Sequence, residues 1–216
     1  MQSREPLGAK RFGQPRTHET NLIFNCYDNF KMNRALKDLI LEFNLRKINK
    51  HEFISRLPFN VHQKTSIIND LFTDIISSQN SDEVELSLTL LWTLEENNEF
   101  LDILHKLIVA PWHTRYEDII HDLQTRKSPE SIPFIKQAIQ NKYDYLESYE
   151  TGTGQFISQC GYALYSIGTK EAHQTILELS KSNNDIIKAE MEYQLKRINN
   201  DQDAEDTKKT KRWWTI

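Results

Sequence analysis

The chain has 216 residues, of which 38% are hydrophobic and 27% charged, and its formal net charge is −4. This composition is ordinary for a soluble protein with one sizeable core, and it excludes a wholly disordered chain. No stretch approaches the roughly 18 apolar residues of a membrane span, and residues 1–20 lack the apolar segment of a secretion signal. We therefore expect a cytoplasmic protein with no membrane partner.

The two ends of the chain differ in composition from the middle. Residues 1–20 combine proline, glycine and basic side chains, which predicts a basic N-terminal arm. Residues 21–200 are expected to form a single domain, and residues 201–216 a charged tail that ends in Trp213 and Trp214. Basic residues outnumber acidic ones in the N-terminal arm, whereas the two kinds cancel in the C-terminal tail, so the middle is more acidic than the net charge suggests. An acidic body favours a partner with a basic surface.

Apolar residues recur at helical spacing through most of the chain. The predicted helices, in chain order, cover residues 33–43, 49–57, 61–79, 81–98, 100–109, 113–123, 128–141, 155–167, 169–182 and 185–198. Residues 143–154 are predicted to be a loop. No glycine occurs between Gln14 and Thr151, and tight β-hairpins depend on glycine at positive φ. These patterns predict an all-α protein.

One helix start occurs twice in the sequence, 41 residues apart, at residues 128–131 and 169–172. The apolar positions around it match in pairs, Leu123 with Leu164, Ile135 with Ile176 and Ala138 with Leu179. A fainter copy precedes the first, where Glu99 corresponds to Glu130. Recurrence of a helix pair every 30 to 45 residues is typical of an α-solenoid, in which each pair buries its apolar face against its neighbours.

Five short segments between Val109 and Gln194 resemble a group of small bacterial HEAT-repeat proteins. These segments are Ala110-Pro111-Trp112-His113, Tyr116-Glu117-Asp118-Ile119, Lys127-Ser128-Pro129, Tyr143-Asp144-Tyr145-Leu146 and residues 167–172. Several members of that group look like immunity proteins of polymorphic or contact-dependent toxin systems. The resemblance implies a solenoid of HEAT-like antiparallel helix pairs, and an immunity role in which the protein binds a cognate toxin domain. The loop after Leu146 is longer and richer in glycine than the pattern of that group.

The Trp112 turn is the first candidate for a partner-binding site. Trp112, His113, Arg115 and Tyr116 stand at the junction where Pro111 ends one helix and the next one begins. An aromatic residue at such a junction either packs between consecutive repeats or contacts a ligand. Both roles remain open on the sequence alone.

The tyrosine-rich loop is the second candidate. Tyr143, Tyr145 and Tyr149 alternate there with acidic residues, among them Glu147 and Glu150. Tyrosines offer rigid, amphipathic contact area, and carboxylates select a basic partner. The alternative is a solvated loop with its tyrosines folded onto the core.

Residues of the usual catalytic and metal-binding types form no site-like pattern. His113, Glu117 and His121 share a helical spacing, but the arrangement is not that of a zinc site, and a solvated helix face is the better interpretation. Cys26 and Cys160 are too few for a disulfide framework and are expected to be free, buried thiols. We expect no enzyme activity, no metal and no cofactor.

Three functions are compatible with these patterns to different degrees. The leading hypothesis is an immunity protein whose acidic and aromatic surface neutralises a cognate toxin domain, for example a basic nuclease. The alternative is a general HEAT-type scaffold with several protein partners. A nucleic-acid-binding repeat protein would need a basic concave face, which an acidic body does not supply.

Overall fold

The computed structural model describes residues 30–148 and 151–213, with side chains up to residue 201. Within these ranges it contains α-helices, two short 3-10 helices and no strand, which confirms the predicted all-α class. The α-helices are α1 (Arg34–Asn44), α2 (Lys50–Ser55), α3 (Lys64–Ser78), α4 (Ser81–Leu94), α5 (Leu101–Ile108), α6 (Tyr116–Arg126), α7 (Ile132–Gln140), α8 (Asp144–Glu147), α9 (Gly152–Ile167), α10 (Lys170–Leu179) and α11 (Asp185–Trp213). The 3-10 helices are η1 (Val61–Gln63) and η2 (Pro129–Ser131). The predicted N-terminal arm lies outside the described residues.

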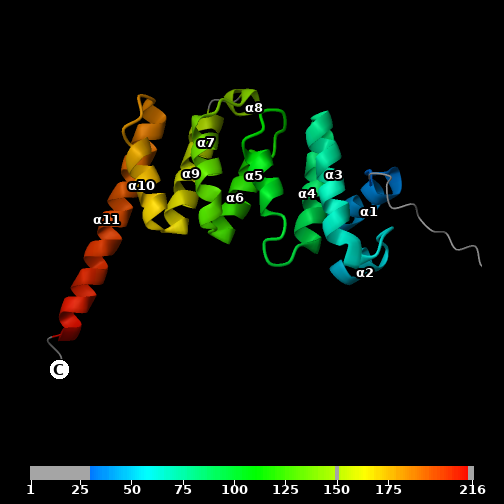
Figure 1. Cartoon of the computed structure of the whole chain (residues 1–216), viewed down its shortest axis with the longest axis horizontal. Coiled ribbons are helices and arrows are strands. Elements are labelled where there is room, and N and C mark those ends of the chain that lie inside the picture. The colour runs from blue at the N-terminus through cyan, green and yellow to red at the C-terminus, as the bar shows by residue number, and fades with distance from the viewer. Residues whose placement is uncertain (1–29, 149–150, 214–216) are drawn as a thin grey trace, which may run out of the picture.

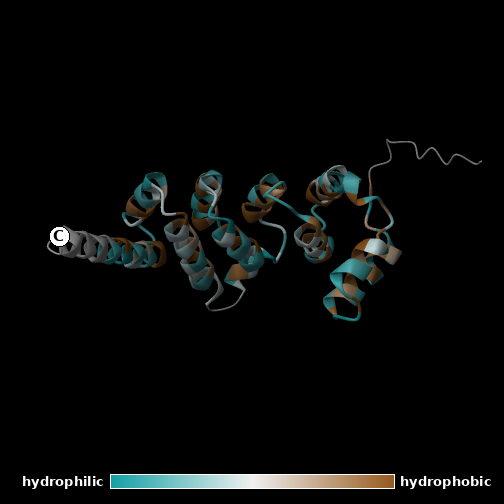
Figure 2. Cartoon of the chain, turned by 90° about the horizontal axis from the view of Figure 1, so that it is seen from below, coloured by the Kyte–Doolittle hydropathy of each residue, from teal (hydrophilic) through white to brown (hydrophobic). Residues whose placement is uncertain are grey.

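The helices follow one another along the long axis of the molecule (Figure 1). Seen after a quarter turn, they stand in two rows (Figure 2). Helices α3, α5, α7 and α10 contact one another successively along one row, while α6, α9 and α11 do so along the other. Pairs such as α3 with α4, α5 with α6 and α10 with α11 pack across the rows. The helices of one row therefore pack against those of the other.

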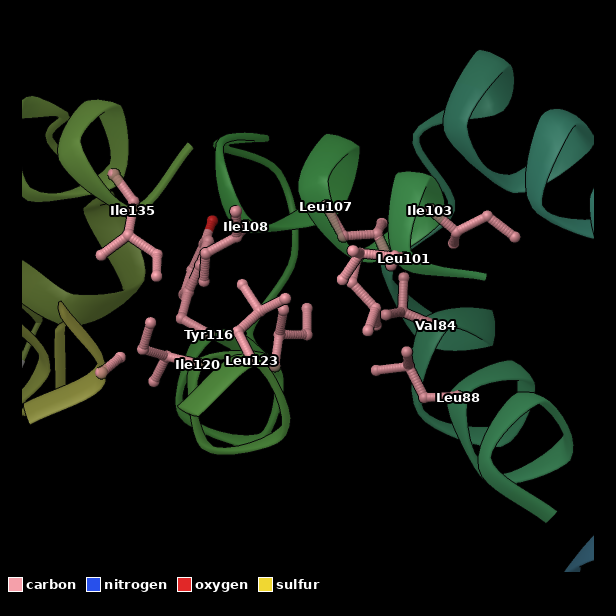
Figure 3. Close-up of a cluster of buried hydrophobic side chains, with 14 of the residues drawn as sticks. Val84, Leu88, Leu101, Ile103, Leu107, Ile108, Tyr116, Ile120, Leu123 and Ile135 are labelled. Carbon is pink, nitrogen blue, oxygen red and sulfur yellow. The ribbon is translucent and has the colours of Figure 1, made fainter. Parts of the chain in front are cut away.

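A continuous hydrophobic core fills the space between the two rows. Val84 of α4, Leu107 of α5 and Ile120 of α6 point into this interior (Figure 3), and all three are fully buried. Removing such side chains from water is the main force that holds a helix pair to its neighbours. The faces that the helical apolar spacing predicts are thus the faces that pack in this core.

The 41-residue sequence repeat corresponds to a repeated local structure. Helices α6 and α9 both end in a residue of left-handed conformation, Lys127 with φ 52° and Gly168 with φ 67°. Such a residue ends a helix and turns the chain sharply into the next one. The matched apolar pairs are buried in both copies, with Ile135 and Ile176 at 0% exposure. The equivalent apolar positions therefore contribute to the core in the same way in both copies.

Several predicted helix starts are confirmed by their caps. The Asn49 side chain accepts a hydrogen bond from the Glu52 N–H at 2.9 Å, as the capping spacing predicts. Thr169 caps α10 in the same way through the Ala172 N–H, at 3.2 Å. Helix α4 ends at Leu94 and not at Asn98, because the backbone of Glu95 is extended.

The prediction of a loop over residues 143–154 is wrong. Residues Asp144–Glu147 form the single turn α8, and α9 begins at Gly152, three residues before the predicted start. The short turn is held to the body because Leu146 is 1% exposed. At the other end, α11 continues beyond its predicted end at Ile198 to Trp213, so most of the predicted charged tail has a helical backbone.

Candidate functional site

His113 connects the Trp112 turn to the end of α5 through a hydrogen bond. The Nε2 atom of His113 donates a hydrogen bond to the Leu107 carbonyl at 2.8 Å, and its Nδ1 accepts one from the Arg115 N–H at 3.0 Å. One nitrogen must carry a proton and the other must not, so these two bonds fix the neutral imidazole. Burial lowers the pKa of His113 and the bond to Leu107 opposes that effect only in part. His113 is therefore a structural residue.

Three further side chains satisfy the next carbonyls of the same helix end. Tyr143 donates to the Ile108 carbonyl at 2.8 Å, Asn141 to that of Val109 at 3.2 Å and Tyr116 to that of Ala110 at 2.9 Å. The last carbonyls of a helix lack partners within the helix, and leaving them unpaired in the interior is costly. We call these three residues and His113 the α5 capping cluster. It joins α5, α6 and the segment between α7 and α8.

Rings of the α5 capping cluster pack directly against one another. The Tyr116 ring centre lies 4.4 Å from that of His113 and 4.3 Å from that of Tyr143, and Phe156 of α9 closes the group at 5.9 Å. Burial raises the pKa of both Tyr116 and Tyr143. Three of the predicted partner-binding residues, His113, Tyr116 and Tyr143, are thus at most 3% exposed. A partner that meets the folded surface cannot reach them.

The other predicted binding residues lie nearer the surface. Trp112 is half-buried against the core, while Tyr145 and Glu147 of α8 are exposed. Arg115 is engaged by Glu85 of α4 and by Asp118 of α6. Tyr149 and Glu150 lie outside the described residues. The structure therefore separates the predicted set into an interior part and a surface part.

A groove that the sequence did not single out lies between α4 and α6. Its larger hollow has a volume of about 520 Å³ and is lined by both helices and the loop that follows α4. A smaller hollow of about 220 Å³ continues it toward the Trp112 turn, and Trp92 and Asp118 line both. We call the two hollows together the α4–α6 groove. Trp92 is 37% exposed and stands where they meet.

Arg126 forms one end of the α4–α6 groove. Its guanidinium donates to Glu95 at 2.6 Å, to Asp122 at 2.7 Å and to the side-chain oxygen of Asn98 at 3.0 Å. The Arg126 side chain is only 8% exposed. Burial disfavours its charge, but the bonds to the two carboxylates outweigh that cost and raise the pKa of Arg126. The pairing ties the end of α4 firmly to α6.

Arg115 occupies the opposite end with the same kind of pairing. It contacts Glu85 of α4 and, at 3.2 Å, Asp118 of α6. Between the two arginines, the Trp92 indole donates its N–H to Asp122 at 2.8 Å. Four carboxylates in the groove thus share two guanidinium groups, so the groove carries an excess of negative charge.

The loop after α4 shapes the wall of the groove beside Arg126. Asn97 and Asn98 have φ values of 59° and 62°, a left-handed conformation that asparagine tolerates better than most residues. Lys64 of α3 holds this loop from behind by donating to the Leu94 carbonyl and contacting Glu99, both at 2.9 Å. The loop is consequently fixed on both sides.

A second exposed cluster lies on α9 and α11. The Arg197 guanidinium sits over the rings of Tyr165, Tyr162 and Tyr193, at 4.0, 4.6 and 5.9 Å from their centres. Tyr193 is 47% exposed. Tyrosine and arginine are the residue types most often found at the energetic centres of interfaces. This tyrosine–arginine cluster is a second surface on which a partner could bind.

The groove has a weak sequence signal that could have been found. Glu85, Thr89 and Trp92 recur at the spacing of one helix face, as do Asp118 and Asp122. The sequence does not show that these two faces stand opposite each other, because that depends on which helices become neighbours in a row.

Three further features of the described residues bear on other kinds of function. Within residues 30–148 and 151–213 there is no set of three His, Cys, Asp or Glu residues placed to hold a metal ion. Cys160 is a free, fully buried thiol whose pKa is raised by burial, whereas Cys26 lies outside the described residues. None of the helices in the described ranges has both the length and the apolarity that a bilayer crossing requires.

Comparisons with known proteins do not indicate a function for this chain. No family model, curated protein or solved structure matches this chain.

Proposed function

We propose that this chain is a HEAT-like α-solenoid that acts as a cytoplasmic immunity protein: it binds a cognate bacterial toxin domain and neutralises it without catalysis. The two rows of helices and the repeated α6–α7 and α9–α10 turns support the solenoid. The resemblance of residues 109–194 to bacterial immunity proteins supports the role.

The observation that carries the proposal is the α4–α6 groove with Trp92 in it. A partly exposed tryptophan in a hollow is the kind of residue that contributes most to tight protein complexes. The surrounding carboxylates outnumber the cations, which accelerates association with a basic protein surface. A basic toxin domain such as a nuclease fits this surface.

The proposal assigns no chemical step to the chain. Both nitrogens of His113 are engaged with the backbone, so it is not free to act as a general base. The Cys160 thiol is fully buried and its pKa is raised, which opposes formation of a nucleophilic thiolate. Neutralisation by binding alone requires neither.

Coexpression with the toxin encoded beside this gene tests the proposal. The parent protein should restore growth, and Trp92→Ala should weaken protection because binding falls by at least about 2 kcal/mol. Leu177→Ala is the matched control, because Leu177 is 40% exposed on α10, in the other row. If the parent protein leaves the toxin fully lethal, the immunity role is wrong.

A general HEAT-type scaffold is the second candidate, and the tyrosine–arginine cluster favours it. Two separate surfaces, the α4–α6 groove and the cluster around Arg197, would allow two partners to bind at once. Affinity purification that recovers several partners, none of them a toxin, would support the scaffold over the immunity protein.

A further inference from the structure

We propose that the α4–α6 groove binds an arginine side chain of the partner, with its guanidinium stacked on the Trp92 ring and paired with Asp118. The inference rests on the proposed function, because it takes the groove to be the partner surface. It goes further by naming the chemical group that the groove receives.

The groove already shows how it accommodates guanidinium groups. Arg115 lies between Glu85 of α4 and Asp118 of α6, and Arg126 lies between Glu95 of α4's end and Asp122 of α6. At both ends, one carboxylate comes from α6 and the other from α4 or the residue that follows it. The spacing of α4 and α6 therefore suits a planar cation that donates to a carboxylate on either side.

The centre of the groove offers an aromatic ring and carboxylates to a third cation. Trp92 is 37% exposed there, and the structure gives no cation over its ring, although it gives three such contacts for Arg197 elsewhere in the described residues. The indole N–H is held by Asp122 at 2.8 Å, which fixes the ring in place. An immobilised indole face beside carboxylates is a favourable site for a cation.

Charge decides in favour of a cationic occupant over an apolar or acidic one. Among the described residues, the cations paired with Glu85, Glu95, Asp118 and Asp122 are Arg115 and Arg126, which leaves two carboxylates in excess. Asp118 is the most available of those on α6, since its side chain is 51% exposed. Guanidinium is preferred to ammonium because its planar face stacks on an aromatic ring while its edge donates to a carboxylate.

The test uses the full chain and short peptides as probes. The probes are a five-residue alanine peptide with one central arginine and blocked ends, and the same peptide with citrulline or lysine in the centre. Citrulline has nearly the shape of arginine but no charge. Binding is followed by the indole N–H resonance of Trp92 in a two-dimensional nitrogen–proton spectrum. The Trp92→Phe variant identifies that resonance among the four tryptophans of the chain.

The arginine peptide should shift the Trp92 resonance and saturate in the millimolar range, as expected for about 4 kcal/mol of binding. Citrulline should give no saturable shift, and lysine should bind at least about threefold more weakly. Asp118→Asn should weaken the arginine peptide by at least about threefold, since it removes the carboxylate half of the site. Glu192→Gln, an exposed carboxylate on α11, is the control and should bind like the parent.

Three results would overturn the inference: no saturable shift with arginine, an equal shift with citrulline, or lysine binding as tightly as arginine. Unchanged binding by Asp118→Asn would overturn the assigned position. These failures are separable from failure of the proposed function. A chain that neutralises its toxin but shows no peptide-induced shift keeps its immunity role and loses this site.

Discussion

The α5 capping cluster and the α4–α6 groove both combine aromatic rings with hydrogen-bonding groups, but they use them in opposite ways. In the cluster, His113, Tyr116 and Tyr143 direct their polar atoms to backbone carbonyls and bury their rings. In the groove, arginines and carboxylates pair with one another between two helices, and the Trp92 ring stays partly in water. The first arrangement leaves nothing for a partner, whereas the second leaves charge and an aromatic face.

The difference teaches that an aromatic residue must be judged by what its polar atom contacts. Tyr116 donates to a carbonyl from inside the core, so its loss leaves both a cavity and an unpaired acceptor. Trp92 donates to a carboxylate at the surface, where water can replace the bond. Stability should therefore depend on the cluster and binding on the groove.

The largest expected effect is on the cluster. Tyr116→Ala should lower the free energy of unfolding by about 3–5 kcal/mol, because it empties the centre of the ring cluster and leaves the Ala110 carbonyl unpaired. Trp92→Ala should cost less than half as much. Urea unfolding followed by circular dichroism measures both losses of unfolding free energy. Equal losses for the two variants would mean that stability does not depend more on the cluster than on the groove.

The sequence predicted the fold better than the site because the two depend on different information. Helical spacing and capping residues such as Asn49 and Thr169 are local, and the structure confirms them. Whether Tyr143 lies on the surface or reaches the Ile108 carbonyl depends on a contact 35 residues away, which local patterns do not contain. The groove likewise requires two helix faces to meet.

A smaller effect is expected for the hydroxyl of Tyr143. Tyr143→Phe keeps the ring but leaves the Ile108 carbonyl without its donor, which should cost about 1–3 kcal/mol. Asn141 also donates to the Tyr143 oxygen at 3.3 Å, so this bond is lost as well. Chemical denaturation of the parent and the variant side by side gives the difference. An unchanged midpoint would mean that the hydroxyl is not needed to cap α5.

Acid should weaken the cluster through His113. Because burial lowers its pKa in the fold, the unfolded chain binds more protons below the ordinary value of 6.5. Stability is therefore complete above about pH 6.5 and falls below it, by at most about 1.4 kcal/mol per pH unit for each such histidine. His105, whose pKa is also lowered mainly by burial, adds a second contribution. Unfolding measured from pH 7.5 to 5 should show a shallower dependence for His113→Gln, and an identical dependence would assign the effect elsewhere.

The smallest effect on stability, and the one that isolates the charge of the groove, is expected for Glu85→Gln. The Glu85 side chain is 59% exposed, and exposed ion pairs contribute little, so the unfolding free energy should change by less than about 0.5 kcal/mol. Its loss nevertheless reduces the negative charge that attracts a basic partner. Association with the toxin domain should slow several-fold at low ionic strength, while dissociation changes little. In 1 M salt, where the screening length is about 3 Å, the difference should nearly vanish.

Stopped-flow measurements at two salt concentrations test the role of Glu85 in association, with Glu192→Gln on α11 as the control for net charge. If both variants slow association equally, the whole acidic body attracts the partner and the groove has no special part in the encounter.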